Sequence, residues 1–324
     1  MIKFSKEIKK IVKTAKNIAV FTHIRPDCDA LGSSLALKEG LVSLGKHVVC
    51  FAKDKLTQNQ SLVFDYPKFS NENCDFSKFD LCFSLDAPTY ERLGDYAEGF
   101  RNHPNTIVFD HHRGNNLKAN YIYAFPNYSS NCEIIMEFLD FLKVKITPNI
   151  ASMLYSGLSA DTNSFINSNT TYQTFVNAAR LVKLGADINK INELQYKNRT
   201  KVEVLCKQYL WKNIQIVNDV AFCEIDNKSL IQLDATKADC DNFSNELLGI
   251  EGINYSFSLI EEEPNNINLS MRSKEGYDVG KIAFKLGGGG HICAAGAVLK
   301  NKTIIQAREI VLDLIKQDKL SKSL

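Results

Sequence analysis

The sequence predicts a two-domain α/β protein, with a doubly wound, mainly parallel sheet followed by a smaller α/β domain. At 324 residues the chain is longer than a usual single domain. Its first half alternates short apolar runs with segments of helical periodicity, which is typical of parallel strands joined by helices. From about residue 213 the pattern changes to pairs of strand-like runs. We therefore expect domains at 1–186 and 213–324, joined by a helical linker at 187–212.

Four short apolar runs are the expected strands of the first domain, at residues 18–22, 47–51, 81–85 and 106–109. The helix after the first run is predicted to begin near Asp29 as its N-cap and to end at Gly45. Further helices are indicated by a capping-box spacing at 130–133, by Thr147-Pro148, and by 170–173, whose helix ends near Gly185.

The second domain is predicted from four more strand-like runs, at 214–217, 221–225, 255–260 and 267–271. A helix with Val279, Ile282, Ala283 and Leu286 on one face then runs into four consecutive glycines. The stretch at 187–211 before this domain is long, polar and helical in pattern. It suits a linker between the two domains.

The composition excludes several classes of protein. A net charge of +2 is nearly neutral, whereas proteins that bind long nucleic acids usually carry a broad basic bias. No run reaches the roughly 20 apolar residues of a membrane span, and the lysine-rich N-terminus lacks the apolar core of a signal peptide. A cytoplasmic protein with a small anionic ligand, bound at a few positive points, is expected.

Nine cysteines are scattered singly, without a C-x-x-C pair. This pattern argues against a disulfide framework and against a cysteine-rich zinc site. Reduced, mostly buried thiols are expected, and Cys28 is the candidate for redox sensitivity because it lies inside an acidic motif.

Acidic residues and histidines follow three of the predicted strands. His23 ends the first, with Asp27 and Asp29 in the loop after it, while Asp86 ends the third and residues 110–112 end the fourth. Parallel sheets bind ligands beyond the carboxyl ends of their strands, so these segments should converge on one crevice. A lone Asp at such a place is more often a helix cap or turn former, and Asp29 can be both cap and ligand.

The residue types fit a site for two metal ions. Carboxylates bind Mn²⁺ and Mg²⁺, and the added imidazoles favour Mn²⁺. Two ions about 3.5–4 Å apart need a bridging carboxylate and can share a hydroxide that attacks phosphorus. Asp86, alone at the end of a central strand, is the expected bridge.

A resemblance follows from these residues. The segment His23-Ile-Arg-Pro-Asp-Cys-Asp-Ala-Leu-Gly-Ser33, together with Asp110-His111-His112, resembles the DHH phosphoesterase superfamily. Asp161-Thr-Asn-Ser-Phe165 resembles the fourth acidic motif of that superfamily. The segments Arg272-Ser273 and Gly287-Gly-Gly-Gly-His-Ile-Cys-Ala-Ala-Gly296 are similar to the accompanying DHHA1 domain. The resemblance covers nearly the whole chain, in order.

Within the superfamily, the size and two-domain plan most resemble the nanoRNase and phosphoadenosine-phosphate phosphatase group. The resemblance implies that one metal is held by His23, Asp27 and Asp86, and the other by Asp29, Asp86, His111 and Asp161. It also implies that His112 contacts the scissile phosphate or protonates the leaving group. Asp110 is expected to orient its neighbours, a common role of carboxylates beside ligating histidines.

The glycine run is the expected substrate clamp of the second domain. Backbone N–H groups of Gly287, Gly288, Gly289 and Gly290 can cradle a phosphate, although four glycines alone are more often a flexible loop. His291 follows directly, and Arg272, with Ser273 beside it, would add a bidentate phosphate contact. Arg113 is also a candidate for phosphate binding or a plain surface cation, and the role of Arg92 stays open between a site residue and a helix-surface residue.

The expected function is a Mn²⁺-dependent phosphodiesterase that cleaves short oligoribonucleotides to 5′-mononucleotides, with 3′-phosphatase activity on 3′-phosphoadenosine 5′-phosphate as an additional possibility. The enzyme alternatives are a phosphodiesterase for cyclic di-AMP or linear dinucleotides, an inorganic pyrophosphatase and a single-strand DNA exonuclease. The last two are weaker, because the second domain carries the glycine motif and the chain lacks a basic channel. A nucleotide-sensing binding protein is the non-enzymatic alternative. The oligomeric state is left open, with a homodimer as one option.

Overall fold

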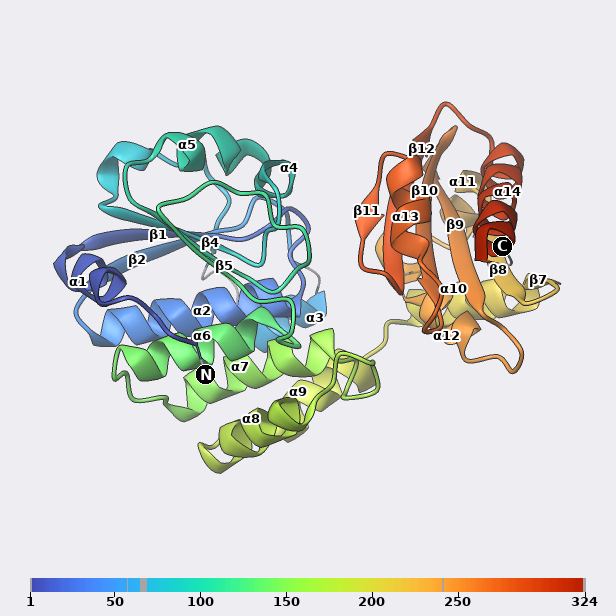
Figure 1. Ribbon diagram of the computed structural model, residues 1–324. Helices are drawn as coiled ribbons and strands as arrows, with labels where there is room; N and C mark the ends of the chain where they lie inside the picture. Colours follow the sequence, from blue (N-terminus) through green and yellow to red (C-terminus); the bar gives the residue numbers. More distant parts are fainter. Residues whose placement is uncertain (1, 57, 65–68, 241, 323–324) are drawn as a thin grey trace. The chain divides into compact units, whose positions relative to one another are not determined.

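The computed structural model describes residues 2–56, 58–64, 69–240 and 242–322. The chain divides into two compact units, Met1–Asn198 and Arg199–Leu324, here called the N-terminal and C-terminal units (Figure 1). Within the described residues, no helix is long and apolar enough to cross a membrane.

The N-terminal unit is built on a six-stranded sheet in the order β3-β2-β1-β4-β5-β6, in which all pairs are parallel. The strands are β1 (Asn17–Phe21), β2 (His47–Phe51), β3 (Phe69–Ser70), β4 (Leu81–Leu85), β5 (Thr106–Asp110) and β6 (Tyr121–Ala124). The doubly wound parallel sheet expected from the sequence is thus confirmed. The chain winds outward from β1 to β3 and returns to start β4 on the other side of β1, which makes the β1–β4 junction the switch point where such sheets bind ligands.

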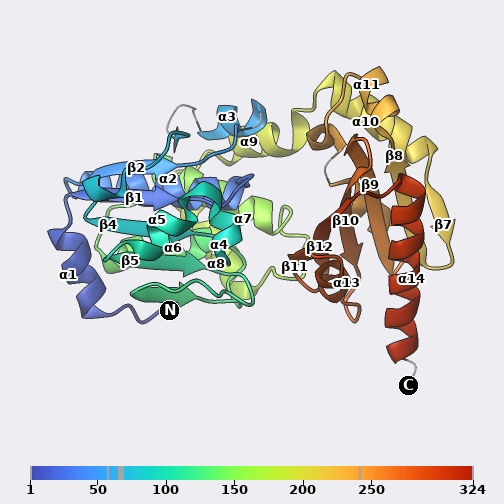
Figure 2. The same ribbon diagram turned by 90° about the horizontal axis from the view of Figure 1, so that it is seen from above.

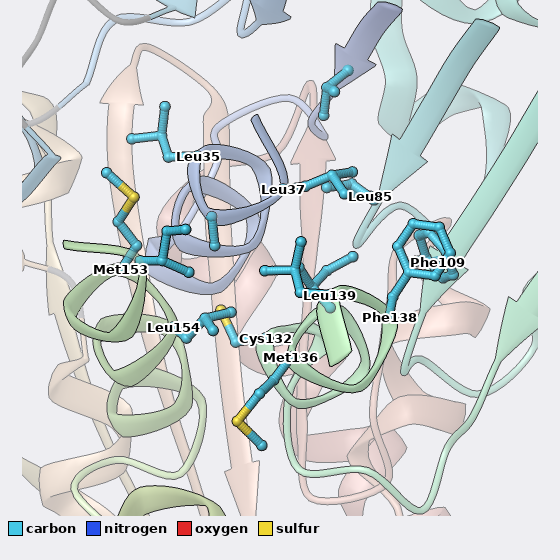
Figure 3. Packing of buried hydrophobic residues seen from close by; sticks show 14 of the residues in the cluster. Leu35, Leu37, Leu85, Phe109, Cys132, Met136, Phe138, Leu139, Met153 and Leu154 are labelled. Atoms are coloured by element: carbon cyan, nitrogen blue, oxygen red, sulfur yellow. The ribbon is translucent and has the colours of Figure 1, made fainter. Parts of the chain in front are cut away.

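Helices cover both faces of this sheet (Figures 1 and 2). One face packs against α2 (Cys28–Ser43), α6 (Asn131–Phe141) and α7 (Pro148–Asp161), and the other against α4 (Tyr90–Leu93) and α5 (Ala97–Asn102). Figure 3 shows the first core, in which Leu37 of α2 lies beside Leu85 of β4, and Phe138 of α6 packs against Phe109 of β5. Other helical segments of this unit are α1 (Lys6–Thr14), α3 (Gln58–Phe64), η1 (Phe76–Lys78), η2 (Gly94–Tyr96) and α8 (Tyr172–Lys183).

The helix starts differ in detail from the prediction. Asp27, not Asp29, is the N-cap of α2, because its carboxylate accepts the N–H groups of Asp29 and Ala30. Asp29 therefore lies in the first turn, with its own carboxylate available for other partners. The predicted caps Ser130 of α6 and Thr147 of α7 are confirmed, but Glu133 accepts from Ser129 rather than closing a reciprocal capping box on Ser130. The cap of α8 is Thr171.

Two glycines let α2, α6 and α7 approach closely. A Cβ on Gly32 of α2 would lie 2.4 Å from the carbonyl oxygen of Met153 in α7. A Cβ on Gly157 of α7 would lie 2.4 Å from Sγ of Cys132 in α6. Because of this close packing α2 is buried nearly all round, and its first turn lies against the first residues of α6.

The predicted linker at 187–212 is not one continuous helix. Helix α9 (Ile188–Asn192) passes into a π-helical turn, η3 (Glu193–Lys197), and α10 (Lys201–Lys212) begins only after Thr200. Thr200 and Glu203 form a capping box, which favours a new helix start at this point. Gln195 and Tyr196 hydrogen-bond to α7, so the first part of the segment packs with the N-terminal unit.

The C-terminal unit is a six-stranded mixed sheet in the order β11-β12-β10-β9-β8-β7, antiparallel except for the pair β8–β9. Its strands are β7 (Gln215–Val217), β8 (Val220–Ile225), β9 (Tyr255–Glu263), β10 (Asn266–Ser273), β11 (Gly289–Gly290) and β12 (Ala294–Lys300). Helices α13 (Val279–Lys285) and α14 (Ile304–Lys322) cover one face, and α10, α11 (Asn227–Gln232), η4 (Lys237–Cys240) and α12 (Phe243–Leu248) cover the other.

Candidate active site

The chemistry-bearing residues of the N-terminal unit meet at one edge of its sheet. His23 lies two residues after β1, Asp86 directly follows β4, and Asp110 is the last residue of β5. These three strands are neighbours and parallel, so their carboxyl ends lie side by side. Asp161 reaches the same place from the last position of α7.

Asp86 lies at the centre of the cluster and is almost fully buried. Its Oδ2 is 3.6 Å from Nε2 of His23, while its Oδ1 is 3.3 Å from Nε2 of His111 and 3.4 Å from Nδ1 of His112. Its backbone φ is +59°, in the left-handed region, which Asp tolerates better than most residues. One carboxylate thus presents a separate oxygen to each of two groups of residues.

Three groups of side chains bring ligand atoms within 4.8 Å of one another. They are His23, Asp27 and Asp86; Asp29, His111 and Asp161; and Asp86, His111 and His112. All six residues that the sequence proposes as metal ligands are therefore brought together. Each of these groups could hold a metal ion.

Carboxylates and imidazoles lie close together in this cluster, and their mutual interactions shift their pKa values. Burial opposes the charged form of His23, but the nearby carboxylates of Asp27 and Asp86 outweigh it and raise the pKa of His23 to about 10. Burial would raise the pKa of Asp86, yet the neighbouring imidazoles of His111 and His23 lower it well below the ordinary value. For Asp161, burial raises the pKa, and the carboxylates of Asp27 and Asp86 help to outweigh the opposing effect of His111.

Asp29 is anchored by the N-terminus of α6, a contact that the sequence does not reveal. Its Oδ2 accepts the N–H of Asn131 at 2.6 Å, and its Oδ1 accepts the N–H of Cys132 at 2.9 Å. Burial and the charges of Asp86 and Asp161 nevertheless raise its pKa well above the ordinary value. The two backbone donors fix the orientation of the carboxylate, whose Oδ2 lies 3.7 Å from Nε2 of His111.

Asp110 does not join the carboxylate cluster but holds His112 in place. Its Oδ1 is 2.8 Å from Nδ1 of His112 and also accepts the backbone N–H of that residue, while its Oδ2 accepts from Asn115 at 2.7 Å. A carboxylate oxygen accepts, so Nδ1 of His112 carries the hydrogen and Nε2 is the basic nitrogen of the neutral ring. Burial lowers the pKa of His112, but the hydrogen bond to Asp110 and the charge of Asp86 raise it overall.

Arg92, whose role the sequence leaves open, lies beside His23. Its Nη2 is 2.8 Å from Nδ1 of His23, which is also 2.9 Å from the carbonyl oxygen of Ile24. If Nδ1 of His23 carries no hydrogen, it accepts a hydrogen bond from the guanidinium of Arg92. If Nδ1 carries the hydrogen, it donates to the carbonyl oxygen of Ile24, because a guanidinium cannot accept. The second arrangement leaves Nε2 of His23 as the lone-pair nitrogen facing Asp27 and Asp86.

The turn after Asp161 has an unusual backbone. Asn163, Ser164 and Phe165 have φ values of +47°, +57° and +67° in succession. The side-chain amides of Asn167 and Asn169 both donate to the carbonyl oxygen of Asp161, at 3.2 Å. Left-handed backbone of this kind persists only where neighbouring contacts hold it, and it is frequent at functional sites.

The nine cysteines form no disulfide, and six of them are buried. All nine lie in the described part of the chain. Burial and the charge of Asp27 raise the pKa of Cys28 to about 12. Because the thiolate is the reactive form, a pKa raised in this way disfavours reaction at Cys28.

The candidate substrate residues of the C-terminal unit gather at one end of its sheet. Arg272 of β10 is paired in register with Ala294 of β12, at the turn that follows His291. Ser273 is buried, and its hydroxyl donates to the carbonyl oxygen of Tyr277. Residues 294–296, which end the motif that starts at Gly287, begin β12.

The structural requirement for glycine differs among the four positions 287–290. A Cβ on Gly288 would lie 2.1 Å from the carbonyl oxygen of Gly296, and one on Gly290 would lie 2.5 Å from that of Ala294, so packing against β12 requires both. Gly287 has φ +74°. Gly289 has neither a positive φ nor a described atom within 4 Å of an added Cβ, so packing does not explain it. Arg113, in the N-terminal unit, is exposed.

Comparisons with known proteins agree with this arrangement. Residues 17–158 match the DHH family, N-terminal domain, and residues 218–317 match the DHHA1 domain. Among curated relatives, the "Bifunctional oligoribonuclease and PAP phosphatase NrnA" of Mycoplasma pneumoniae is 30% identical over 301 residues, covering 91% of both chains. The protein of that name from Thermus thermophilus is 29% identical, covering 96% of this chain and 93% of its own.

A solved structure shows the same fold over nearly the whole chain. An exopolyphosphatase-related protein from Bacteroides fragilis superposes with a TM-score of 0.90 at 21% identity, covering 96% of this chain and 95% of that one. At that identity the likeness concerns the fold alone. The family matches and the full-length relatives carry the conclusion: the chain belongs to the DHH phosphoesterase family, with a DHHA1 domain, and to its group of bifunctional oligoribonucleases and PAP phosphatases.

Proposed function

We propose that this protein is a Mn²⁺-dependent phosphodiesterase that hydrolyses short oligoribonucleotides to 5′-mononucleotides and also removes the 3′-phosphate of 3′-phosphoadenosine 5′-phosphate. The observation that carries the proposal is the position of Asp86, whose two oxygens face two different groups of candidate ligands. The names of the full-length relatives support this choice of substrates.

His23, Asp27 and Asp86 would hold one cation, and Asp29, Asp86, His111 and Asp161 the other. The buried atoms Nε2 of His23 and Oδ1 of Asp86 have no hydrogen-bond partner within the described part of the chain, which fits atoms reserved for a metal. Imidazoles among the carboxylates favour Mn²⁺ over Mg²⁺. Bound divalent cations would neutralise charge on the phosphate and make water a stronger nucleophile.

His112 is the proposed catalytic acid, and Asp110 positions it. The hydrogen bond from Nδ1 to Asp110 fixes the ring and leaves Nε2 as the nitrogen that would carry a proton to the departing oxygen. His112 is also the more exposed member of the His111–His112 pair, as a residue that meets substrate must be.

The C-terminal unit is the proposed substrate clamp. Arg272 would pair with a phosphate through its guanidinium, and the N–H groups of residues 287–290 would cradle the same anion. His291 and Ser273 would complete the site, His291 by contact and Ser273 by holding the turn at Tyr277. Arg113 would add a cation near the metal cluster. The segment 187–212 would serve as linker between the catalytic and substrate-binding domains.

A product assay tests the substrate assignment. The purified protein should be given dinucleotides, longer RNA, 3′-phosphoadenosine 5′-phosphate and cyclic di-AMP, with Mn²⁺ and with Mg²⁺. We expect the highest kcat/KM on di- and trinucleotides with Mn²⁺, releasing 5′-mononucleotides. A higher kcat/KM on cyclic di-AMP would favour the alternative phosphodiesterase. Tight nucleotide binding without hydrolysis would instead support a nucleotide sensor.

The variant Asp86→Ala tests the mechanism. Because Asp86 belongs to two of the three candidate ligand groups, its loss should lower turnover on every substrate by at least about 1,000-fold, or about 4 kcal/mol in activation free energy. The matched control is Asp95→Ala, which removes an exposed carboxylate of the same unit. An Asp86→Ala protein that kept a tenth of the turnover in excess Mn²⁺ would contradict the mechanism.

A cytoplasmic location is also proposed, supported by the scattered cysteines and the small nucleotide substrates. The metal loaded in the cell is proposed to be Mn²⁺, which metal analysis of protein purified from its own source would test.

A further inference from the structure

The proposed substrate clamp of the C-terminal unit accounts for a phosphate but not for a nucleobase. Arg272, the glycine run and His291 all suit an anion, whereas every nucleotide also carries a flat base that stacks well on an aromatic ring. Phe284 presents such a ring next to the clamp. It belongs to α13, lies three residues before Gly287 and is 78% exposed.

Helix α13 turns Phe284 away from the hydrophobic core of its unit. The buried face of this helix consists of Val279, Ile282 and Ala283, which belong to the core that α13 shares with α14. Phe284 lies on the exposed face together with Lys281. Because its ring is left mostly in water, Phe284 contributes little to the stability of the core.

Gly280 shows on which side of α13 the clamp lies. It is four residues before Phe284, so the two positions lie on the same side of the helix, about 6 Å apart along its axis. A Cβ on Gly280 would lie 3.0 Å from the carbonyl oxygen of His291, and the N–H of Val279 donates to the carbonyl oxygen of Ile292 at 2.8 Å. Helical side chains point towards the N-terminus of their helix, which for Phe284 is the end where His291 lies.

The surroundings of the ring suit a ligand that carries both a base and a phosphate. Helix α13 lies beside β11 and β12, and β11 consists of the last two glycines of the run (Figures 1 and 2). Residues 279–300 contain no Asp or Glu, although 37 residues of the chain are acidic. Lys281 and Lys285 are exposed on α13, and Lys281 lies 3.6 Å from Asp278. A phosphate bound here would therefore meet more positive than negative charge.

We propose that Phe284 is the base-stacking residue of the substrate clamp, so that the clamp holds one nucleotide by its phosphate and by its base. Ile292, 41% exposed, extends the apolar surface beside the clamp. The inference rests on the proposed function, in which the C-terminal unit binds substrate. Stacking uses the flat face that every base has, so Phe284 selects nucleotides over other phosphate esters without selecting one base.

A protein partner fits this surface less well. Phe284 and Ile292 together expose roughly 240 Å², at about 200 Å² for a fully exposed large side chain. Each partner of a specific protein interface buries about 800 Å². The ring is also flanked by lysines, which are depleted from the cores of such interfaces. One ring beside a phosphate site matches the size of a single base.

Calorimetric titration of the full chain in Mn²⁺ with two probes tests the inference. Adenosine 5′-monophosphate and ribose 5-phosphate carry the same phosphate, and neither has the phosphodiester or the 3′-phosphate that the proposed enzyme cleaves. The wild type should bind adenosine 5′-monophosphate about tenfold more tightly than ribose 5-phosphate, or better. Phe284→Ala should weaken the binding of adenosine 5′-monophosphate by about tenfold, the size of one base–ring stack, and leave the affinity for ribose 5-phosphate unchanged.

Two further variants make the test specific. Phe284→Trp keeps a flat ring, so it should retain the wild-type affinity, and adenosine 5′-monophosphate should quench its added fluorescence above the background of Trp211. Ile231→Ala is the matched control, because it shortens an exposed apolar side chain of α11, on the other face of the same sheet. It should bind both probes like the wild type.

Equal affinity of the wild type for the two probes would overturn the inference. So would a Phe284→Ala protein that keeps the full preference for adenosine 5′-monophosphate, or an Ile231→Ala protein that loses the preference to the same extent. These titrations need no turnover, so they are independent of the product assay. A protein that binds adenosine 5′-monophosphate through Phe284 but releases no mononucleotides from dinucleotides would support this inference and contradict the proposed function alone.

Discussion

Asp29 and Asp80 show how surroundings change the effect of the same contact. Each carboxylate accepts two backbone N–H groups: Asp80 from Lys16 and Asn17, and Asp29 from the start of α6. At the exposed Asp80 these hydrogen bonds lower the pKa. At Asp29 burial and the neighbouring carboxylates outweigh them and raise the pKa. The carboxylate of Asp80 thus stabilises the fold through its hydrogen bonds. At Asp29 a bound cation would reduce the repulsion between the carboxylates.

The variant Asp80→Asn should lose the acid-dependent part of this support. Because the folded pKa lies below the ordinary value of 3.8, the carboxylate stabilises the fold above about pH 4, and the stabilisation disappears as the pH falls through the folded pKa. At about pH 6.5 the variant should be less stable than wild type by about 1 kcal/mol or less, since solvent screens an exposed group.

Urea unfolding at about pH 6.5 and at about pH 3 measures the difference in unfolding free energy between the two proteins. That difference should shrink at the lower pH. A difference that stays constant or grows on acidification would show that the two hydrogen bonds to Asp80 are not the cause.

The three packed helices α2, α6 and α7 set the geometry of the metal site. Asp29 comes from the first turn of α2, its backbone donors from the start of α6, and Asp161 from the end of α7. The glycines at the helix crossings allow this approach, because a single added methyl group would meet backbone or buried sulfur. The site therefore depends on how closely the helices pack as well as on its ligands.

Gly157→Ala should push these helices apart. Its Cβ would lie 2.4 Å from Sγ of Cys132 and 2.8 Å from Cα of Asp29, and the latter is a backbone atom that cannot rotate away. Alanine improves helix propensity by about 1 kcal/mol, but overpacking costs about 1–3 kcal/mol, so we expect net destabilisation. Calorimetric titration should also show weaker Mn²⁺ binding.

Gly289→Ala is the control, since no described atom would lie within 4 Å of its Cβ. It should unfold like wild type. If Gly157→Ala matched wild type in both unfolding and Mn²⁺ affinity, close helix packing would not be what holds Asp29 in place.

At the scale of the molecule, the two units have separate hydrophobic cores. All candidate metal ligands lie in Met1–Asn198, while Arg199–Leu324 has its own sheet with a hydrophobic core on each face. Four carboxylates are crowded into the first unit, and cations would relieve their repulsion there alone.

Metal removal should therefore lower the stability of the N-terminal unit only. Mn²⁺ at about 100 times its Kd would stabilise the unit that binds it by about 2.7 kcal/mol. Hydrogen exchange of the full chain with Mn²⁺ and with EDTA should show lost protection in EDTA within residues 1–198, centred on the segments around Asp29, Asp86 and Asp161. Equal loss of protection across both units, or none, would contradict this assignment.

The sequence by itself determined the parallel sheet, the ends of its central strands and the identity of the clustered residues. Strand periodicity and the motifs at 23–33, 110–112 and 161–165 are local in the chain, so they could be interpreted without coordinates. The short strands β3 and β6 were not predicted, because edge strands of two and four residues show too little periodicity to be recognised in the sequence. Strand β12 was not predicted, because it begins with alanine and glycine, which have low strand propensity.

Only the tertiary structure decided which groups hold the candidate ligands in place. Arg92 lies beside His23, although 69 residues separate them, and the N–H groups that orient Asp29 come from a helix about 100 residues away. The exposure of Tyr172 and Phe175 on α8 could not be predicted either, because apolar residues at helical spacing normally indicate a buried helix face. Long-range contacts of this kind depend on how the elements pack, and the local sequence pattern does not encode them.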